Sequence, residues 1–432
     1  MWIPESDMNQ LDTKLADREK DGCPIRVGLI GAGQMGTEIV AQVGEMAGMR
    51  VSVVVDLTLE RAAQAYAVSR RHIEPVVTND LAEAGRALAE GRCVATTDFR
   101  CATTLPSIDA VIDATGAPDT GAAAALDAIR NRRHVVMMNV ECDVTVGHIL
   151  GCRAQRAGVV YSLASGDEPA AILELCRFAR ALGFRIVAAG KGKNNPLDVH
   201  ATPGDWEEPA RKRGMSPRML VEFVDGSKTM VEMAAVSNAT GLVPDVPGMH
   251  GPHVLRADLT RVFCPRSQGG ILEKEGVVDY AIGDVHPGVF VIVTTDNPTI
   301  RAGLVQRDMG PGPNYLLFRP YHLCSLEVPL TVARAVFYGE SSGHPLPVPT
   351  SECVAVTKKG LGAGEILDGI GEYCYRGNIL CRGAARSADA LPLGLARGCV
   401  TRRDIPADTV ITRDMVEPVA GSLLFALWEG RA

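Results

Sequence analysis

The chain has 432 residues, of which 46% are hydrophobic and 22% are charged, a balance that is typical of globular enzymes and excludes a disordered or fibrous protein. Its formal net charge is −7 and it has no block of like charges, so we expect no nucleic-acid partner. No apolar run reaches the roughly 18 residues of a membrane span and the first residues do not resemble a secretion signal, so we expect a cytoplasmic protein without a membrane partner.

The first part of the chain alternates strands and helices. Residues 1–21 have the pattern of a polar amphipathic helix. From Pro24 to about Val160, short strands rich in Val and Ile then alternate with helices rich in Ala. Such strands are typical of parallel sheets covered on both faces. The sequence therefore predicts an α/β domain with a doubly wound parallel sheet over residues 22–160.

Two further regions follow. Residues 161–345 mix helical segments with short, interrupted strands, which predicts an α+β domain for substrate binding and dimerisation. After a Pro-rich stretch, residues 350–432 contain two similar pieces, VTKKGLGAGEILDGIG and VTRRDIPADTVITRDMV. A weak internal repeat of this kind predicts a small β-rich C-terminal domain built from two related hairpins. The length agrees with three domains of roughly 150 residues each.

The strongest motif is GAGQMG, which follows the first predicted strand and opens a helix. Gly31 permits the tight turn, Gly33 lets the backbone approach a pyrophosphate, and Gly36 lets the helix pack closely on the strand. The first turn of the helix offers free N–H groups to the phosphates. The motif predicts a Rossmann fold that binds NAD or NADP, with Gln34 and Met35 as further contacts to the cofactor.

Other cofactor contacts follow the later strands. Asp56 ends the second strand, where a carboxylate binds the ribose hydroxyls of NAD. Arg61, on the next helix, is either a ligand for the 2′-phosphate of NADP or a surface charge, so the choice between NAD and NADP stays open. Thr115 and Gly116, in the DATGAPDT segment, and Asn139, at the end of a later strand, are also expected to contact the cofactor.

Five segments in order, GLIGAGQMG, DATGAP, HVVMMNVECD, SGDEP and GKGKNNPLD, resemble the homoserine-dehydrogenase-like oxidoreductases with a C-terminal SAF domain. That group includes enzymes similar to 1-deoxy-D-xylulose 5-phosphate reductoisomerase, which act in isoprenoid biosynthesis. The resemblance extends over nearly the whole chain and implies an NAD(P)-dependent oxidoreductase, a SAF-like domain at residues 350–432, and a homodimer. Homoserine dehydrogenases proper carry a lysine where this chain has Val140 or Glu141, which argues against homoserine oxidation.

Carboxylates cluster near the end of the nucleotide domain. Glu141 follows a strand, where ligands collect in open α/β sheets, while the neighbouring Asp143 could equally cap a helix. Asp167 and Glu168 lie at a turn into a helix, next to Ser165, a candidate substrate contact. Together with Glu141, these two carboxylates would offer oxygen ligands to Mg²⁺ or Mn²⁺, which we keep as a hypothesis.

The densest polar segment is GKGKNNP, predicted as a loop directly after the strand FRIVAAG. Lys191 and Lys193 are candidate catalytic groups that polarise a carbonyl, and Asn194 and Asn195 are candidate substrate contacts. The alternative is a solvated basic loop.

A second candidate cluster lies on a predicted helix near residues 217–240. Lys228 and Glu232 are candidate catalytic residues and Asn238 a candidate substrate contact. An exposed ion pair between Lys228 and Glu232, which are four residues apart, is the simpler alternative. The spacing of His250 and His253 does not decide between acid–base groups, metal ligands and neither.

The residues and the resemblance together predict an enzyme that reduces a small carbonyl compound, phosphorylated or not, with NAD(P)H. The most concrete version is the reductoisomerase-like reaction, and the alternative is homoserine dehydrogenase or another small hydroxy-acid or sugar-acid dehydrogenase. A nucleotide-sensing regulatory protein is a third possibility, which the Lys191 segment disfavours because a sensor needs no such group.

Overall fold

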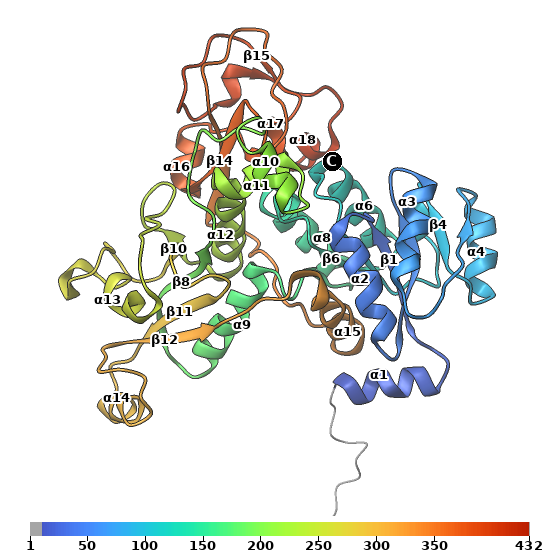
Figure 1. Ribbon diagram of the computed structural model, residues 1–432, viewed down its shortest axis with the longest axis horizontal. Helices are drawn as coiled ribbons and strands as arrows, with labels where there is room; N and C mark the ends of the chain where they lie inside the picture. The colour runs from blue at the N-terminus through green and yellow to red at the C-terminus, as the bar shows by residue number, and fades with distance from the viewer. Residues whose placement is uncertain (1–10, 432) are drawn as a thin grey trace, which may run out of the picture. The chain divides into compact units, whose positions relative to one another are not determined.

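The computed structural model describes residues 11–431, and the chain forms two compact units (Figure 1). The first unit comprises Met1–Cys142, Ile149–Asp167 and Leu323–His344, and the second comprises Asp143–His148, Glu168–His322 and Pro345–Ala432. The division into domains at 22–160, 161–345 and 350–432 stays a prediction, because compactness does not show which parts fold on their own. Of the helix expected over residues 1–21, α1 (Leu11–Lys20) is confirmed and the first ten residues lie outside the described part.

A parallel sheet forms the centre of the first unit. Its strands are β1 (Ile25–Ile30), β2 (Met49–Val55), β3 (Val76–Val77), β4 (Val94–Thr96), β5 (Ala110–Asp113), β6 (His134–Met137) and β7 (Tyr161–Leu163). They lie in the order β3-β4-β2-β1-β5-β6-β7, and each neighbouring pair is parallel. The winding reverses at β1, which has β2 on one side and β5 on the other. The doubly wound sheet predicted from the sequence is thus confirmed.

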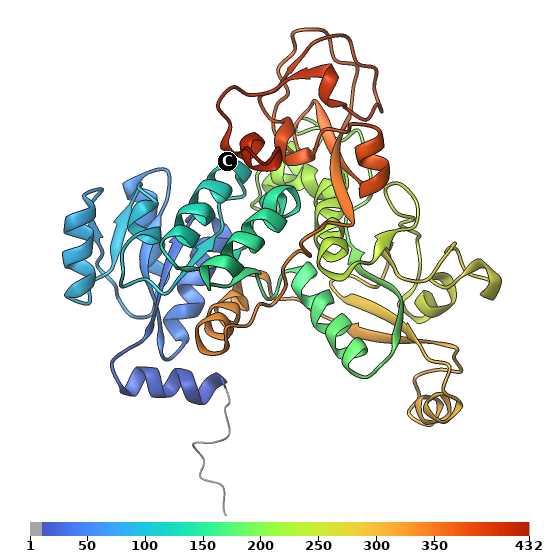
Figure 2. The same cartoon turned by 180° about the vertical axis from the view of Figure 1, so that it is seen from behind.

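Helices cover both faces of this sheet, because crossovers between parallel strands are generally right-handed and the strand order runs in opposite directions on the two sides of β1. On one face lie α2 (Gln34–Glu45) and α3 (Leu59–Gln64), with α2 turned toward the viewer in Figure 1. On the other face lie α6 (Pro118–Arg130) and α8 (His148–Ala157), the teal helices nearer the viewer in Figure 2. The unit also contains α4 (Leu81–Ala89), α5 (Arg100–Thr103) and the short α7 (Val140–Cys142).

A late segment completes the first unit. Helix α15 (Val328–Tyr338), drawn in brown, packs against α1 and α2 (Figure 1). Its Val328 and Val332 join the apolar core beneath β1 and β2, and the Lys14 ammonium lies 4.6 Å from the ring centre of Tyr338. The nucleotide-binding part of the chain therefore depends on residues far beyond its own sequence segment.

The second unit is built on a mixed sheet. Its strands are β8 (Arg185–Lys193), β9 (Val243–Pro244), β10 (Val277–Ile282), β11 (Val289–Thr294) and β12 (Asn314–Arg319), in the order β12-β11-β8-β10-β9. β8 and β10 are parallel, whereas β11 is antiparallel to both β8 and β12. This sheet confirms the predicted α+β character of the region.

Helices α9 (Glu168–Ala181) and α12 (Ser227–Thr240) pack against each other and against this sheet. The long helix expected near residues 217–240 is in fact two helices, because Gly226 has φ 86° and ends the run between α11 (Pro217–Val224) and α12. The sheet also carries an apolar core around Phe263 and Phe290, to which α13 (Leu259–Val262) contributes. Two more helices are α10 (Glu207–Lys212) and α14 (Pro298–Val305).

The C-terminal region of the second unit is rich in β-structure. It contains β13 (Ser351–Thr357), β14 (Tyr375–Cys381), α16 (Arg382–Ser387), α17 (Leu393–Ala396), β15 (Val400–Thr401), β16 (Val416–Glu417) and α18 (Leu423–Trp428). β13 pairs with β14 and β15 with β16, and the two similar sequence pieces also pair with each other through Leu361 and Ile405. No helix in the described part of the chain is both long enough and apolar enough to span a membrane.

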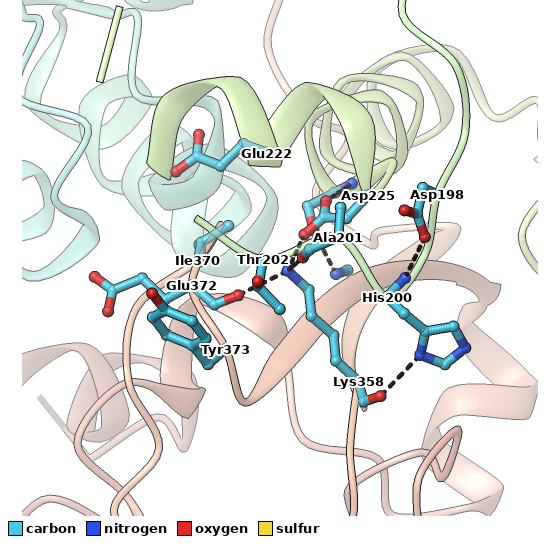
Figure 3. A network of polar contacts seen from close by, with 12 residues as sticks. Asp198, His200, Ala201, Thr202, Glu222, Asp225, Lys358, Ile370, Glu372 and Tyr373 are labelled. Carbon is cyan, nitrogen blue, oxygen red and sulfur yellow. Dashed lines mark hydrogen bonds and ion pairs between the residues drawn. The ribbon is translucent and has the colours of Figure 1, made fainter. Parts of the chain in front are cut away.

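A buried lysine attaches this region to the rest of the second unit. Lys358 Nζ lies 2.7 Å from Asp225 Oδ2 and donates to the carbonyls of Ala201 and Glu372, each at 2.8 Å. Figure 3 shows the Lys358 side chain directed at these three residues, while its own carbonyl contacts the His200 ring. Because Lys358 and Asp225 are almost fully buried, breaking this pair would leave an uncompensated charge in the interior.

Candidate active site

The glycine motif forms the tight turn that the sequence predicts. Gly31 has φ 101°, and a Cβ there would lie 2.6 Å from the carbonyl oxygen of Ala114. A Cβ on Gly36 would lie 1.9 Å from the Gly31 carbonyl oxygen, whereas a Cβ on Gly33 would meet no atom within 4 Å. Gly31 and Gly36 are thus required by the packing of the fold. Gly33 instead borders open space, where a pyrophosphate would lie.

Helix α2 begins directly at this turn. Its N-cap is Gly33, and among the described residues no side chain accepts a hydrogen bond at that cap. The first N–H groups of the helix, those of Gln34, Met35 and Gly36, therefore lack a partner within the helix and suit an anion. The Gln34 side chain points to Glu38 at 3.3 Å, so Gln34 and Met35 offer backbone rather than side-chain contacts to a phosphate.

Asp56 and Arg61 lie together at the end of β2. Asp56 Oδ2 accepts a hydrogen bond from the N–H of Ala32 at 2.7 Å, and Oδ1 accepts one from Leu57 at 2.8 Å. Arg61 Nε lies 3.3 Å from Asp56 Oδ1, and the Arg61 side chain is about half exposed. The carboxylate that favours NAD and the guanidinium that favours NADP are therefore direct neighbours.

The loop after β5 is organised by a buried carboxylate that sequence reasoning missed. Asp113 Oδ1 accepts hydrogen bonds from the Thr115 N–H at 3.0 Å and from its hydroxyl at 2.7 Å, and Oδ2 accepts one from Asn139 Nδ2 at 3.3 Å. Burial raises the pKa of Asp113 to about 6. Thr115 and Asn139 were predicted as cofactor contacts, yet their side chains bind Asp113. They therefore shape the loop, in which Gly116 has φ 62°.

The loops after β1 and β5 meet where the winding of the sheet reverses. The Ala114 N–H donates to the Ile30 carbonyl at 2.8 Å, and Gly31 packs directly on Ala114. Ligands of open α/β sheets bind in the crevice outside the strand ends at such a reversal. The first unit therefore has the geometry of a dinucleotide site, and the open side of Gly33 lies in it.

In the second unit, Lys191 and Lys193 belong to β8 itself, and the prediction of a loop there was wrong. Consecutive side chains of a strand alternate between its faces, so these two lysines lie on the same face of the sheet. Lys191 Nζ donates to Glu168 Oε1 at 2.7 Å and also to Glu232 Oε2. Lys191, Glu168 and Glu232 are all buried, and we call them the lysine–carboxylate cluster.

Electrostatics in this cluster favour an extra proton. Burial opposes the charge of Lys191, but Glu168 and Glu232 outweigh it and hold the lysine pKa well above its usual value. Burial, together with the charge of Glu168, raises the pKa of Glu232. Two carboxylates and one ammonium carry a net negative charge, which the interior tolerates poorly. The cluster is therefore suited to take up and release a proton at Glu232.

Two histidines that sequence reasoning missed adjoin the cluster. His322 Nδ1 lies 2.8 Å from the Pro287 carbonyl, and because a carbonyl only accepts, Nδ1 is the donor. His322 Nε2 then faces Glu168 Oε1 at 3.4 Å. Burial, and next the charge of His322, lowers the pKa of His286. No sequence motif marks these histidines, which lie on connections between strands.

Lys193 has a different environment from Lys191. Its ammonium donates to the carbonyls of Asn195, Pro196 and Phe223 at 3.0, 3.2 and 2.6 Å. Burial, and next the charge of Lys191, lowers the Lys193 pKa to about 8. Its three hydrogens are thus engaged with the backbone, so Lys193 orders the segment after β8. Asn195 in that segment is buried and bonds to Asn194, whose own side chain is exposed.

The three residues predicted to form a site on one helix, Lys228, Glu232 and Asn238, have different surroundings in the structure. Glu232 is buried against Lys191, so its interaction with Lys228 is not the exposed one that the spacing suggested. Lys228 itself is half-buried. Asn238 Oδ1 accepts from the N–H groups of Thr350 and Ser351 at 2.9 and 3.0 Å, which holds the start of β13. Asn238 was predicted to contact the substrate, and its side-chain oxygen instead binds the backbone of the protein.

His250 also has structural partners. Its Nδ1 lies 2.8 Å from Asp279 Oδ2, and its Nε2 lies 3.6 Å from Asp245 Oδ2. The hydrogen bond with Asp279 raises the pKa of His250. This pair fastens the segment before β10 to the strand.

The remaining predicted residues lie close to the boundary in sequence between the units. Glu141 is buried within α7, and the helical turns continue through Asp143, which is therefore not a helix cap. The Ser165 hydroxyl bonds to that of Ser342 at 2.8 Å. Glu141 and Asp167 belong to the first unit, whereas Glu168 belongs to the second unit and accepts a hydrogen bond from Lys191. The binding of a metal ion by these three carboxylates stays a prediction.

Comparison with known proteins places the cluster in a catalytic region. The family described as Oxidoreductase DRL, catalytic domain, matches residues 166–328, which include Glu168, Lys191, Glu232 and His322. No curated protein matches the chain.

Several solved structures are similar to the chain at a low level. A probable dehydrogenase from Thermotoga maritima is 14% identical, with a TM-score of 0.41 over 73% of this chain and 90% of that one. A putative myo-inositol dehydrogenase from Sinorhizobium meliloti is 13% identical, with a TM-score of 0.37 over 73% and 90%. The Lactobacillus casei scyllo-inositol dehydrogenase with bound NAD(H) and scyllo-inositol is 11% identical, with a TM-score of 0.37 over 68% and 76%. Such low scores say nothing about the substrate of this chain.

The family match and the structure of the first unit both indicate an oxidoreductase. The match is to the catalytic domain of an oxidoreductase family and covers residues 166–328, most of which lie in the second unit. The parallel sheet and the turn at Gly31 supply a dinucleotide site in the first. The protein is an NAD(P)-dependent oxidoreductase.

Proposed function

We propose that the protein reduces a small carbonyl compound, and that Lys191 donates a proton to the carbonyl oxygen. The observation that carries this proposal is the buried ammonium of Lys191, held between Glu168 and Glu232 inside the matched catalytic region. The glycine turn would hold NAD(P)H, which would supply the hydride. The open side of Gly33 and the uncapped start of α2 fit its pyrophosphate.

Lys191 acts where charge develops. As hydride reaches the carbonyl carbon, negative charge builds on the oxygen, and a fixed ammonium stabilises that charge more than the ground-state dipole. Lys191 then transfers a proton to the oxygen, and the product is an alcohol. The carboxyl group of Glu232, whose pKa burial raises, returns a proton to Lys191. Each turnover thus consumes one hydride and one proton.

Glu168 connects this centre to a route for protons. Its Oε1 contacts both Lys191 and the His322 ring, so a proton can pass between His322 and the cluster. Because His322 is held by the Pro287 carbonyl, the ring keeps Nε2 directed at Glu168. We assign His322 the role of relaying the proton that restores the cluster after each turnover.

The resemblance of the sequence suggests a substrate. The reductoisomerase-like reaction on a phosphorylated ketose is its most concrete version, and homoserine or another small hydroxy acid or sugar acid is the alternative. Lys193 has no hydrogen left for a phosphate, since all three contact carbonyls. A phosphorylated substrate would therefore bind its phosphate through other groups.

The test is an assay of NADH and NADPH oxidation, run separately, against small ketoses, their phosphates and semialdehydes. We expect one of these classes to support turnover in the parent protein and in Lys212→Met, a control at an exposed lysine on α10. Lys191→Met should lose that turnover. If no carbonyl compound is reduced with either cofactor, the proposal is wrong.

The same assay tests the metal hypothesis. We propose that EDTA leaves turnover unchanged, because the ammonium of Lys191 already neutralises the Glu168 carboxylate. If EDTA abolishes turnover and Mg²⁺ or Mn²⁺ restores it, a cation acts at the site and Lys191 is not its main electrophilic group.

A further inference from the structure

A buried carboxylate at the end of β5 controls the two connections that follow β5 and β6. Asp113 is 2% exposed, and its Oδ1 accepts hydrogen bonds from the N–H and the hydroxyl of Thr115. Its Oδ2 accepts one from Asn139, whose own Oδ1 accepts from the Cys142 N–H at 3.1 Å. The Thr115 hydroxyl oxygen in turn accepts from the Ala117 N–H at 3.2 Å. Asp113 therefore holds both the loop between β5 and α6 and the segment that opens α7.

The loop between β5 and α6 forms one wall of the dinucleotide crevice. The Ala114 N–H donates to the Ile30 carbonyl, and the Ala114 carbonyl faces Gly31, where a Cβ would lie 2.6 Å from its oxygen. Gly116, further along the loop, is exposed and has φ 62°. Ligands of open α/β sheets bind where the winding reverses, which here is between this loop and the glycine turn. Displacement of the loop would therefore change the shape of the cofactor site.

The hydrogen bonds around Asp113 require an ionised carboxyl group. The groups that bind its oxygens are a backbone N–H, a hydroxyl and a side-chain amide, and all three donate a hydrogen. A carboxylate can accept all three, whereas a protonated carboxyl group carries a hydrogen of its own on one oxygen. That hydrogen would face the Thr115 N–H on Oδ1 or the Asn139 amide on Oδ2, and a buried donor without an acceptor is destabilising. Protonation of Asp113 would therefore break at least one of the hydrogen bonds that hold the loop.

Apolar and small residues separate Asp113 from solvent. Its neighbours across the sheet are Ile30 on β1 and Met137 on β6. On α6, Gly121 packs so closely that a Cβ there would clash with Asp113 Oδ2. A charge buried in this way is stabilised by the hydrogen bonds that it accepts, so the ionisation of Asp113 and the conformation of the loop depend on each other.

Burial also moves the titration of Asp113 toward neutral pH. It raises the pKa of the carboxyl group to about 6, although the hydrogen bonds from Thr115 and Asn139 lower it. The charge of Glu141 on α7 adds to the rise. On α6 the first charged residue is Asp119, which is exposed. In the protein without cofactor, Asp113 is therefore mostly ionised at pH 7.5 and mostly protonated at pH 5.0.

We propose that Asp113 is a positioning residue for the nicotinamide dinucleotide, and that acidification releases the cofactor because protonation of this carboxylate frees the loop after β5. The ionised carboxylate holds the loop against the glycine turn, and the cofactor binds this arrangement. Affinity for the cofactor then follows the ionised fraction of Asp113. The inference rests on the dinucleotide site alone, so its test does not depend on whether Lys191 assists the reduction of a carbonyl compound.

Calorimetric titration of the full chain with NAD⁺ and with NADP⁺, from pH 5.0 to pH 7.5 at constant ionic strength, tests this proposal. The affinity of the parent should fall by about tenfold from pH 7.5 to pH 5.0, because the ionised fraction of Asp113 falls by that factor. Asp113→Asn should bind more weakly than the parent at pH 7.5 and about equally at pH 5.0. Glu90→Gln, which changes an exposed carboxylate at the end of α4, should follow the parent at every pH. Comparison of the proteins at the same pH cancels any titration of the cofactor itself.

Thr115→Val distinguishes this role of Asp113 from a purely structural one. Loss of the Thr115 hydroxyl removes a hydrogen bond that favours the ionised carboxylate, so the midpoint of the affinity profile should move to higher pH. If Asp113 only supported the fold, the variant would change the affinity without moving this midpoint.

Four results would overturn the proposal. They are the failure of the parent to bind either dinucleotide, an affinity of the parent that does not change with pH, the same pH profile in Asp113→Asn as in the parent, and an unchanged midpoint in Thr115→Val. Should Asp113→Asn not fold, as judged by circular dichroism, the midpoint in Thr115→Val decides.

Discussion

The Asp56 carboxylate accepts a hydrogen bond from the Ala32 N–H at 2.7 Å, which joins the end of β2 to the glycine turn after β1. The same carboxylate pairs with Arg61. A carboxylate at the end of this strand binds the ribose hydroxyls of NAD and repels the 2′-phosphate of NADP, whereas an arginine beside it attracts that phosphate. The balance between these two side chains should set the choice of cofactor.

Asp56→Ala should therefore raise the efficiency with NADPH relative to NADH, by about tenfold for a change of roughly 1.4 kcal/mol. Asp56→Asn keeps an acceptor for Ala32 and removes only the charge, so it should shift the ratio in the same direction. The measurement is kcat/KM with each cofactor. A ratio that does not move in either variant would place Asp56 outside the site.

Gly33→Val should abolish cofactor binding and leave the fold intact. A Cβ at Gly33 meets no protein atom within 4 Å, so the new side chain enters only the space of the pyrophosphate. Surface changes of this kind alter stability by less than about 0.5 kcal/mol. Fluorescence titration with NADH and NADPH, together with thermal unfolding, measures both effects.

Gly36→Val is the contrasting variant. Its Cβ would lie 1.9 Å from the Gly31 carbonyl oxygen, so it should lower the melting temperature as well as the affinity. Unchanged cofactor affinity in Gly33→Val would contradict the assignment of the turn.

Sequence and structure agree best where the signal is local. The glycine motif, the strand before it and the helix after it are contiguous, so their geometry follows from one short segment. The lysine–carboxylate cluster joins β8 to α9 and α12, with partners 23 and 41 residues from Lys191. The spacing of residues within a short segment cannot predict contacts over such separations in the sequence. The pattern at Lys228 and Glu232 instead suggested a surface pair, because α12 carries polar residues although nearly all of it is buried.

Lys193 should make the stability of the protein depend on pH. Its pKa is about 8 in the folded protein and 10.5 in the unfolded chain. Between these values the unfolded chain holds a proton that the native state has lost, so the free energy of unfolding rises with pH. This gain in the free energy of unfolding is absent below about pH 8 and complete above about pH 10.5.

Urea unfolding at pH 7.5 and pH 9.5 measures this effect when the parent is compared with Lys193→Met. The stability of the parent relative to the variant should increase at the higher pH, and other titrating groups cancel in the comparison. If the free energy of unfolding of the parent minus that of Lys193→Met stays constant or decreases at the higher pH, the Lys193 ammonium is not destabilised by burial.

The protein should form a two-fold homodimer through the sheet of the second unit. Two-fold dimers are the commonest assembly of soluble enzymes, and the family that the sequence resembles is expected to pair in this way. Light scattering at micromolar concentration should give twice the mass of the chain. A stable monomer under these conditions would contradict the prediction.

The most direct test of the proposed role of Lys191 is the turnover of Lys191→Met with the carbonyl substrate that the parent reduces. This change keeps the length of the side chain and removes the ammonium between Glu168 and Glu232. Loss of one such donor lowers turnover by about 100- to 1000-fold, and cofactor affinity should stay constant because the glycine turn is untouched. Lys212→Met should match the parent. Turnover of Lys191→Met within about threefold of the parent, a loss below roughly 1 kcal/mol, would show that Lys191 does not stabilise the developing charge.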